Sequence, residues 1–136
     1  MPSINEIQDT IIEEFGYFDQ WMDKYEYLID IGKKLPLIKK QFKTDVYLIP
    51  GCQSRVWLYA DKQGDRIIYT ADSDAIITRG LISLLIRVLS GQTAEDISQS
   101  DLYFIARIGL DQHLSPTRSN GLLSMVNQMK RFSYSL

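Results

Sequence analysis

The stretch "SRVWLYADKQGDRIIYTA", Ser54–Ala71, carries the strongest indication of the fold. Its first part, Ser54–Ala60, is aromatic and β-branched with an alternating character, and Arg66–Ala71 has a similar composition. The polar "DKQGD" between the two parts contains Gly64 and is typical of a turn. This stretch therefore predicts two antiparallel strands joined by a short connection.

A third strand is predicted just before this pair. The run "DVYLIP", Asp45–Pro50, favours extended structure and is ended by its proline. Cys52, the only cysteine of the chain, then falls in the turn between this strand and the next. We expect an antiparallel meander of three neighbouring strands with Cys52 in its first connection.

Helical patterns precede the strands. A capping box at Ser3–Glu6 opens a helix whose apolar residues from Ile4 to Phe15 recur with helical spacing. A second helix is predicted over Gln20–Lys33, with Asp19 as its N-cap. A short helical turn is expected at Leu37–Phe42.

Helical patterns also follow the strands. Either Asp72 or Asp74 is expected to cap a helix that runs to Leu89. Three further helices are expected, one opened by Thr93 and Asp96, one over Leu102–Ile108 and one preceded by Ser115 and Pro116. The order of elements predicts one α+β domain over residues 1–136, a small three-stranded antiparallel sheet flanked by helices.

Charge and hydropathy exclude several classes of function. The 15 basic and 17 acidic residues give a formal charge of -2, so no cationic excess favours nucleic-acid binding. The longest apolar run, Ala75–Leu89, is interrupted by Arg79 and Arg87 and falls short of the about 20 residues that span a bilayer. A single cysteine and the absence of a secretory signal favour a reducing compartment. We expect a soluble, cytoplasmic protein that binds neither nucleic acid nor membrane.

Metal binding and hydrolysis are disfavoured by the same residues. Cys52 and the only histidine, His113, fall short of the ligand set of a structural zinc site, so no metal is expected. A cysteine hydrolase would need His113 as the base beside Cys52, but a hydrogen-bonded histidine before the last helix is the favoured interpretation. A redox-active thiol usually works with a resolving cysteine, so disulfide-type exchange here requires a second molecule.

The thiol needs activation if it is to react. An unperturbed thiol is only a few per cent thiolate at neutral pH. The candidate cations are Arg55, close in sequence to Cys52, and Arg118 in the turn "SPTRSNG". Both arginines are also compatible with an ordinary solvated position on the surface.

The motif "GCQSRVW", Gly51–Trp57, resembles the signature of the SufE-like family of sulfur-acceptor proteins. Three further segments also resemble blocks of that family and occur in the family's order. They are "YEYLIDIGKKLP" at Tyr25–Pro36, "DSDAIITRGL" at Asp72–Leu81 and "QHLSPTRSNGL" at Gln112–Leu122. Because the four blocks together cover most of the chain, the resemblance is more specific than "GCQS" alone.

The resemblance implies that Cys52 accepts persulfide sulfur from a cysteine desulfurase of the SufS or CsdA type and relays it to iron–sulfur cluster assembly, with a SufBCD-type scaffold complex as a further partner. Pyridoxal phosphate belongs to the desulfurase, so no cofactor is expected in this chain. The protein would be a sulfur carrier and activator rather than a stand-alone enzyme. The family fold, shared with IscU-type scaffolds, agrees with the predicted sheet and helices.

The resemblance also implies a set of supporting or partner-binding residues, namely Gly51, Gln53, Ser54, Asp74, His113 and Arg118. We expect Asp74 and Arg118 to flank Cys52, with a helix cap and an ion pair as their structural alternatives. Cys52 is expected to rest against apolar side chains and to swing out on docking. Two other functions stay open: a non-covalent activator that works by docking alone, and a thiol redox sensor.

Overall fold

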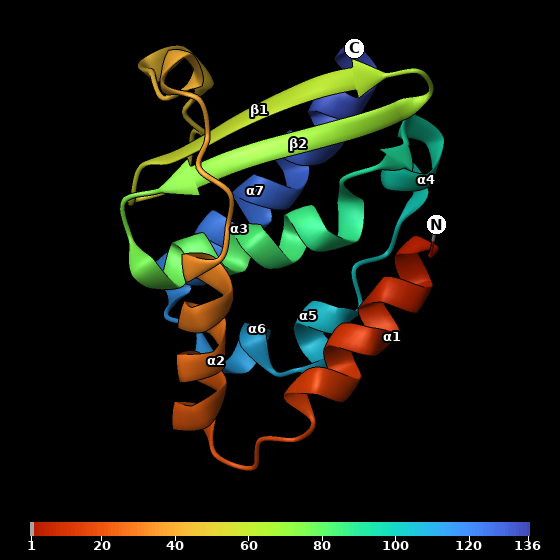
Figure 1. Cartoon of the computed structure of the whole chain (residues 1–136). Coiled ribbons are helices and arrows are strands. Elements are labelled where there is room, and N and C mark those ends of the chain that lie inside the picture. The colour runs from red at the N-terminus through yellow and green to blue at the C-terminus, as the bar shows by residue number, and fades with distance from the viewer. Residues whose placement is uncertain (1) are drawn as a thin grey trace.

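A long hairpin forms the centre of the sheet (Figure 1). In the computed structural model, which describes residues 2–136, β1 (Val56–Gln63) and β2 (Arg66–Ser73) pair antiparallel along their whole length. Gly64, with φ of +63°, lies in the tight turn between them. The hairpin predicted from the central stretch is confirmed.

The third strand lies on the other edge of the sheet from the one predicted. β3 (Gln92–Thr93) pairs with the beginning of β2, which gives the order β1-β2-β3. The segment before β1 instead forms a 3₁₀ helix at Asp45–Tyr47 and a single bridge from Leu48 to Trp57. A strand here was the wrong prediction, because Pro50 has no N–H to donate and the chain then leaves the sheet. The fold class, α+β with a three-stranded antiparallel sheet flanked by helices, is confirmed.

The two N-terminal helices are α1 (Ile4–Phe15) and α2 (Trp21–Lys33). The predicted capping box is present, since Ser3 Oγ accepts from the Glu6 amide and the Glu6 carboxylate accepts from the Ser3 amide. The prediction of Asp19 as N-cap of α2 is wrong. Gln20 holds that position, without a side-chain hydrogen bond.

The long central helix, α3 (Ile76–Leu89), begins without a side-chain cap. The prediction that Asp72 or Asp74 caps it is wrong, because β2 runs on to Ser73 and both carboxylates have other partners. Asp72 forms ion pairs with Lys43 and Arg79. Asp74 accepts from a backbone amide of the loop that precedes β1.

The remaining helices follow β3: α4 (Ala94–Gln99), α5 (Phe104–Arg107), α6 (Leu110–His113) and α7 (Pro116–Ser135). The predicted caps Thr93 and Ser115 are confirmed, each accepting a backbone N–H of the first turn. The helix predicted over Leu102–Ile108 is shorter and is separated from α6 by Gly109, which has φ of +88°. The short turn expected at Leu37–Phe42 is a 3₁₀ helix over Lys40–Phe42.

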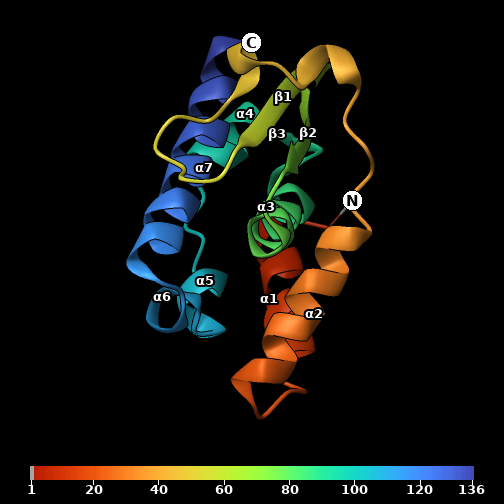
Figure 2. The same cartoon turned by 90° about the vertical axis from the view of Figure 1, so that its left-hand side faces the viewer.

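Helix α3 is the centre of the core. Figure 2 shows it end-on, with the sheet above it, α1 and α2 below it and α7 to the left. Two glycines bring α2 and α3 into backbone contact: a Cβ on Gly80 would lie 2.3 Å from the Leu28 carbonyl oxygen, and one on Gly32 would lie 2.8 Å from the Gly80 nitrogen. Gly32 therefore allows the backbones of α2 and α3 to cross in close contact. No helix in residues 2–136 has the length and hydropathy needed to cross a bilayer.

An ion pair ties α1 to α3 and gives a testable pH dependence. The Arg87 guanidinium donates two hydrogen bonds to the Glu14 carboxylate, one of them at 2.8 Å, and Tyr27 Oη donates to the same carboxylate at 2.6 Å. The bond from Arg87 is the main reason that the pKa of Glu14 is lowered to about 2. The ionised carboxylate is thus stabilised in the folded protein.

Replacing Glu14 by glutamine is expected to reduce the free energy of unfolding by about 2 kcal/mol near neutral pH. Because the folded pKa is depressed, this contribution is complete above the unfolded pKa of the carboxyl group and is lost as the pH falls through about 2. Urea denaturation across this pH range measures the effect. The matched control is Glu13→Gln, which changes an exposed carboxylate of the same helix. If Glu14→Gln lost the same free energy of unfolding at neutral pH and near pH 2, the stabilisation could not come from the ionised Glu14 carboxylate.

Candidate functional site

The loop that carries the cysteine, Pro50–Ser54, is fixed at both ends by backbone pairing. On the entry side, the Ile49 amide donates to the Val56 carbonyl at 2.9 Å. On the exit side, the Arg55 amide donates to Asp74 Oδ1 at 3.0 Å, and the Asp74 amide donates to the Arg55 carbonyl at 3.2 Å. Any motion of the thiol is therefore confined to a short segment between two fixed ends.

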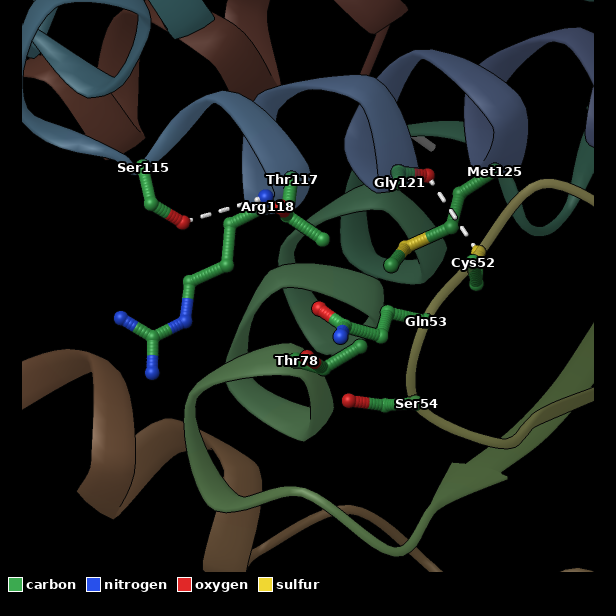
Figure 3. A pocket seen from close by; sticks show the side chains of 9 residues that line it. All are labelled: Cys52, Gln53, Ser54, Thr78, Ser115, Thr117, Arg118, Gly121 and Met125. Carbon is green, nitrogen blue, oxygen red and sulfur yellow. Dashed lines mark hydrogen bonds between the residues drawn. The ribbon is translucent and has the colours of Figure 1, made fainter.

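The tip of the loop lies on α7 (Figure 3). The Cys52 thiol donates to the Gly121 carbonyl, with 3.6 Å between sulfur and oxygen. A Cβ on Gly121 would lie 3.7 Å from that sulfur, which is ordinary van der Waals contact, so the thiol packs directly on α7. Gly51 has φ of +87°, and a Cβ there would lie 2.5 Å from Ser124 Oγ. Gly51 thus allows the loop to approach α7 closely.

The thiol is half-buried and packs against the hydrophobic core. Burial disfavours the charged form, and it raises the pKa of the Cys52 thiol above its ordinary value. At neutral pH the sulfur in this conformation is protonated and is a weak nucleophile. The geometry describes a sheltered resting state.

A pocket of about 320 Å³ opens beside the thiol (Figure 3). Its lining comes from the cysteine loop, α3 and the first half of α7: Cys52, Gln53, Ser54, Thr78, Ser115, Thr117, Arg118, Gly121 and Met125. Hydroxyl, amide and guanidinium groups dominate this lining, and no carboxylate is part of it. Among residues 2–136, no carboxylate forms an ion pair with the Arg118 guanidinium. The pocket is therefore polar with a cationic wall.

The predicted site residues divide into two groups. The first group lies at the thiol: Gln53, Ser54 and Arg118 line the same pocket as Cys52, and Gly51 directly precedes Cys52 in the loop.

Asp74 and His113 lie outside this lining. Asp74 fixes the base of the loop through Arg55. The His113 ring packs edge-on against Trp21, with 4.2 Å between ring centroids, and its Nδ1 lies 3.0 Å from the Gly109 carbonyl oxygen. The structure does not bring His113 to the thiol, so the cysteine-hydrolase interpretation lacks its base.

The described part of the chain, residues 2–136, contains no group of three or more histidine, cysteine or acidic residues arranged to hold a metal ion.

Comparison with known proteins identifies the family. The family model "SufE: Fe-S metabolism associated domain" matches residues 9–133. The chain belongs to the SufE family. The resemblance drawn from the four sequence motifs is confirmed.

Relatives of this SufE-family chain align over most of its length. An uncharacterized SufE-like protein of Rhizobium meliloti is 39% identical over 90% of this chain and 91% of its own. The sulfur acceptor protein CsdE of Escherichia coli is 37% identical over 84% of this chain and 79% of its own. The chloroplastic/mitochondrial SufE-like protein 1 of Arabidopsis thaliana is 39% identical over 89% of this chain, which corresponds to 33% of that longer protein.

A solved structure has the same fold. The solution structure of a hypothetical protein from Thermus thermophilus superposes with a TM-score of 0.76 over 96% of this chain and 97% of its own, at 18% identity. At that identity the match shows the fold alone.

Several residues of this SufE-family site were not found by sequence reasoning: Thr78, Ser115, Thr117, Gly121, Ser124 and Met125. For Ser115 the sequence predicts only a position just before the last helix. Gly121 carried a usable signal, because a glycine inside a predicted helix often marks a close approach.

Replacing Gly51 by alanine is expected to release the loop from α7 and to speed alkylation of Cys52 about tenfold, because the substitution adds a side chain at positive φ and against Ser124. The rate with iodoacetamide, followed by mass, measures it. Gly64→Ala is the matched control, since Gly64 also has positive φ but no atom within 4 Å of its Cβ position. If both variants react alike, the contact with Ser124 does not restrain the thiol.

Proposed function

We propose that this SufE-family protein is a sulfur acceptor and activator for a cysteine desulfurase, with Cys52 as the acceptor. The observation that carries the proposal is the position of the only thiol of the chain. It lies at the tip of a loop fixed at its base, sheltered by α7 and beside a pocket. The family assignment and the relative named a sulfur acceptor protein support it.

The transfer step is a thiol–persulfide exchange. The Cys52 thiol first loses its proton to solvent. Its thiolate attacks the outer sulfur of the persulfide on the donor cysteine. The bond between that sulfur and the donor sulfur breaks as the new bond to Cys52 Sγ forms, and the donor leaves as a thiolate that takes up a proton. One acceptor cysteine is sufficient, and no oxidant or reductant is consumed.

Transfer requires the loop to open. In the resting loop, burial raises the pKa of Cys52, so the reactive thiolate is scarce. When the contacts of Cys52 with Gly121 and of Gly51 with Ser124 are broken, the sulfur reaches water and its pKa falls towards the ordinary value. The pairing of Arg55 with Asp74 keeps the base of the loop in place during this motion. We therefore infer that the resting state protects the thiol and that docking exposes it.

The pocket residues have supporting roles in this scheme. Arg118 supplies positive charge on the wall of the pocket, which favours a thiolate or persulfide anion within it. Gln53 and Ser54 flank the sulfur in the loop. A redox sensor is less compatible with this site, since sensor thiols are exposed and have a low pKa.

The family assignment supports a proposal for the partner and the destination of the sulfur. We propose a desulfurase of the SufS or CsdA type, which carries the pyridoxal phosphate, and transfer onward to iron–sulfur assembly, for which a SufBCD-type scaffold complex is the candidate. The description of the family as associated with Fe-S metabolism supports that destination. We place this relay in the cytoplasm, where reducing conditions keep a lone thiol free. The protein then acts as an accessory carrier rather than as an enzyme alone.

Intact mass spectrometry under non-reducing conditions tests the proposal. After incubation with a cysteine desulfurase of the same organism and L-cysteine, we expect a gain of one sulfur atom that reductant removes. Cys52→Ser should show no gain. Absence of the gain in the wild-type protein, while desulfurase turnover is still stimulated, would replace the carrier by a docking activator.

A further inference from the structure

The charge of this chain is unevenly distributed. The connection from α2 to β1, residues 34–55, carries the cations Lys34, Lys39, Lys40, Lys43 and Arg55 and one carboxylate, that of Asp45. Five positive and one negative side chain give it a formal charge of +4, in a chain whose total is -2. Cys52 lies within the same connection. The acceptor thiol is therefore part of a cationic segment of an acidic protein.

The connection is held in place with its charges outward. Leu35, Ile38 and Ile49 are buried and anchor it to the core. Lys34, Lys39 and Lys40 are exposed between these anchors and have no ion-pair partner among residues 2–136.

Lys43 differs from these lysines, because it pairs with Asp72 and lies over the Trp57 ring. Among residues 2–136, the lysines of this connection without an ion-pair partner are thus Lys34, Lys39 and Lys40.

Two exposed apolar side chains lie near the crossing of α2 and α3. Leu37 is 82% exposed and Ile76, the first residue of α3, is 62% exposed. The crossing places Gly32 against Gly80, and Arg79 Nη2 contacts the Leu35 carbonyl at 3.5 Å. Ile76 lies about one helical turn before this crossing and Leu37 shortly after Leu35. Both side chains therefore lie at the same end of the helix pair.

The same face of the molecule presents the cysteine loop. Figure 2 views this face, with the start of α3 pointing at the viewer, the cysteine loop beside α7 on one side and the α2–β1 connection on the other. We call Leu37, Ile76, Lys34, Lys39, Lys40 and Arg55 the docking surface. It combines an apolar part, Leu37 and Ile76, with four exposed cations on the face that also presents the cysteine loop, and the exposed carboxylate of Asp74 lies beside Arg55.

We propose that the docking surface binds an acidic patch around an apolar hollow on the protein that donates sulfur to Cys52. The proposal rests on the sulfur-acceptor function above. A protein is the favoured occupant because the persulfide must reach a thiol that this face contains, which requires a second polypeptide to cover it. The charge of +4 favours carboxylates on that polypeptide, and Leu37 and Ile76 supply the area that an apolar hollow would bury.

Charge reversal tests the electrostatic part. Binding of this protein to a cysteine desulfurase of the same organism is measured by calorimetry without L-cysteine, at low and moderate salt. Lys39→Glu/Lys40→Glu is expected to raise Kd about 30-fold at low salt and less at moderate salt, because screening weakens exposed charges. The control Lys62→Glu/Arg131→Glu makes the same change of net charge with residues exposed on the far part of β1 and on α7, and should change Kd less than about threefold.

Truncation of the apolar part of the docking surface is the second test. Ile76→Ser is expected to raise Kd about tenfold at both salt concentrations, since the loss is of buried area rather than charge. Met22→Ser is its control, because Met22 is 70% exposed at the start of α2, outside the docking surface. Circular dichroism confirms that each variant is folded.

The outcomes separate this inference from the sulfur-acceptor function. If the two charge-reversal variants bind the desulfurase alike, or if Lys39→Glu/Lys40→Glu loses binding to anionic vesicles or duplex DNA instead, the docking surface is overturned. In that case the sulfur-acceptor function would be unaffected, and Cys52 would still take up sulfur at a saturating concentration of the desulfurase. If the wild-type protein binds through these lysines but takes up no sulfur, the acceptor function fails and the docking surface stands.

Discussion

Replacing Cys52 by serine is expected to abolish the stimulation of a cysteine desulfurase and to leave the affinity of docking nearly unchanged. The hydroxyl of serine has about the size of a thiol but cannot hold sulfane sulfur, so the desulfurase persulfide has no acceptor. With L-cysteine in excess, turnover should fall to that of the desulfurase alone. The Kd should stay within about twofold of the wild-type value, since the side chain is half-buried in the resting loop.

The matched control is Ser54→Ala, which changes another side chain of the same loop and pocket. It should retain most of the stimulation. Stimulation that survives in Cys52→Ser would assign the protein to the docking activators and make the thiol incidental. Oxidation of Cys52 by peroxide at a rate typical of sensor thiols, without desulfurase, would favour the redox sensor instead.

Replacing Gly80 by alanine is expected to lower the free energy of unfolding by about 4 kcal/mol, a large loss for one methyl group. The added Cβ would lie 2.3 Å from the Leu28 carbonyl oxygen, which is backbone and cannot turn aside. α2 would have to move away from α3, and the buried Leu28 side chain, which lies against Gly80, would lose contacts. Urea denaturation measures the loss.

Gly16→Ala provides the comparison for this effect. Gly16 lies at the C-terminus of α1 with ordinary negative φ, and its Cβ position is 3.3 Å from the nearest carbonyl oxygens, those of Glu13 and Ile12. This variant should change the free energy of unfolding by less than about 1 kcal/mol. A similarly small loss for Gly80→Ala would show that the two helices are not held at backbone distance.

Local sequence signals predicted the parts of the fold that depend on neighbouring residues. The hairpin needs only two alternating runs and a glycine turn, and the caps at Ser3, Thr93 and Ser115 need only residues within one turn. These predictions are confirmed because their interactions are local.

The predictions that failed depend on contacts between distant segments. The run Asp45–Pro50 has strand composition, but β1 accepts only a bridge at Leu48 because the cysteine loop must leave the sheet. The edge of β2 is instead covered by Gln92–Thr93, which has no strand pattern of its own. Asp74 looked like a helix cap, yet its oxygen binds the Arg55 amide across the base of the loop.

The site was only partly visible in the sequence for the same reason. Cys52 and its neighbours in the loop stand together in one motif, and Arg118 stands in another. That α7 would cover the thiol depends on the close approach of Gly51 to Ser124 and on the hydrogen bond from Cys52 to the Gly121 carbonyl. Such close approaches between a loop and a distant helix follow from packing, which no periodic pattern encodes.

A single-turnover transfer measures the central claim most directly. A cysteine desulfurase of the same organism is loaded with radiolabelled persulfide, freed of L-cysteine and mixed with this protein, and both chains are separated under non-reducing conditions. We predict that the label leaves the desulfurase and appears on the wild-type chain, in the peptide that contains Cys52, and that it stays on the desulfurase when Cys52→Ser is used. Label that stays on the desulfurase with the wild-type chain, or that moves equally to Cys52→Ser, would contradict the assignment of Cys52 as the sulfur acceptor.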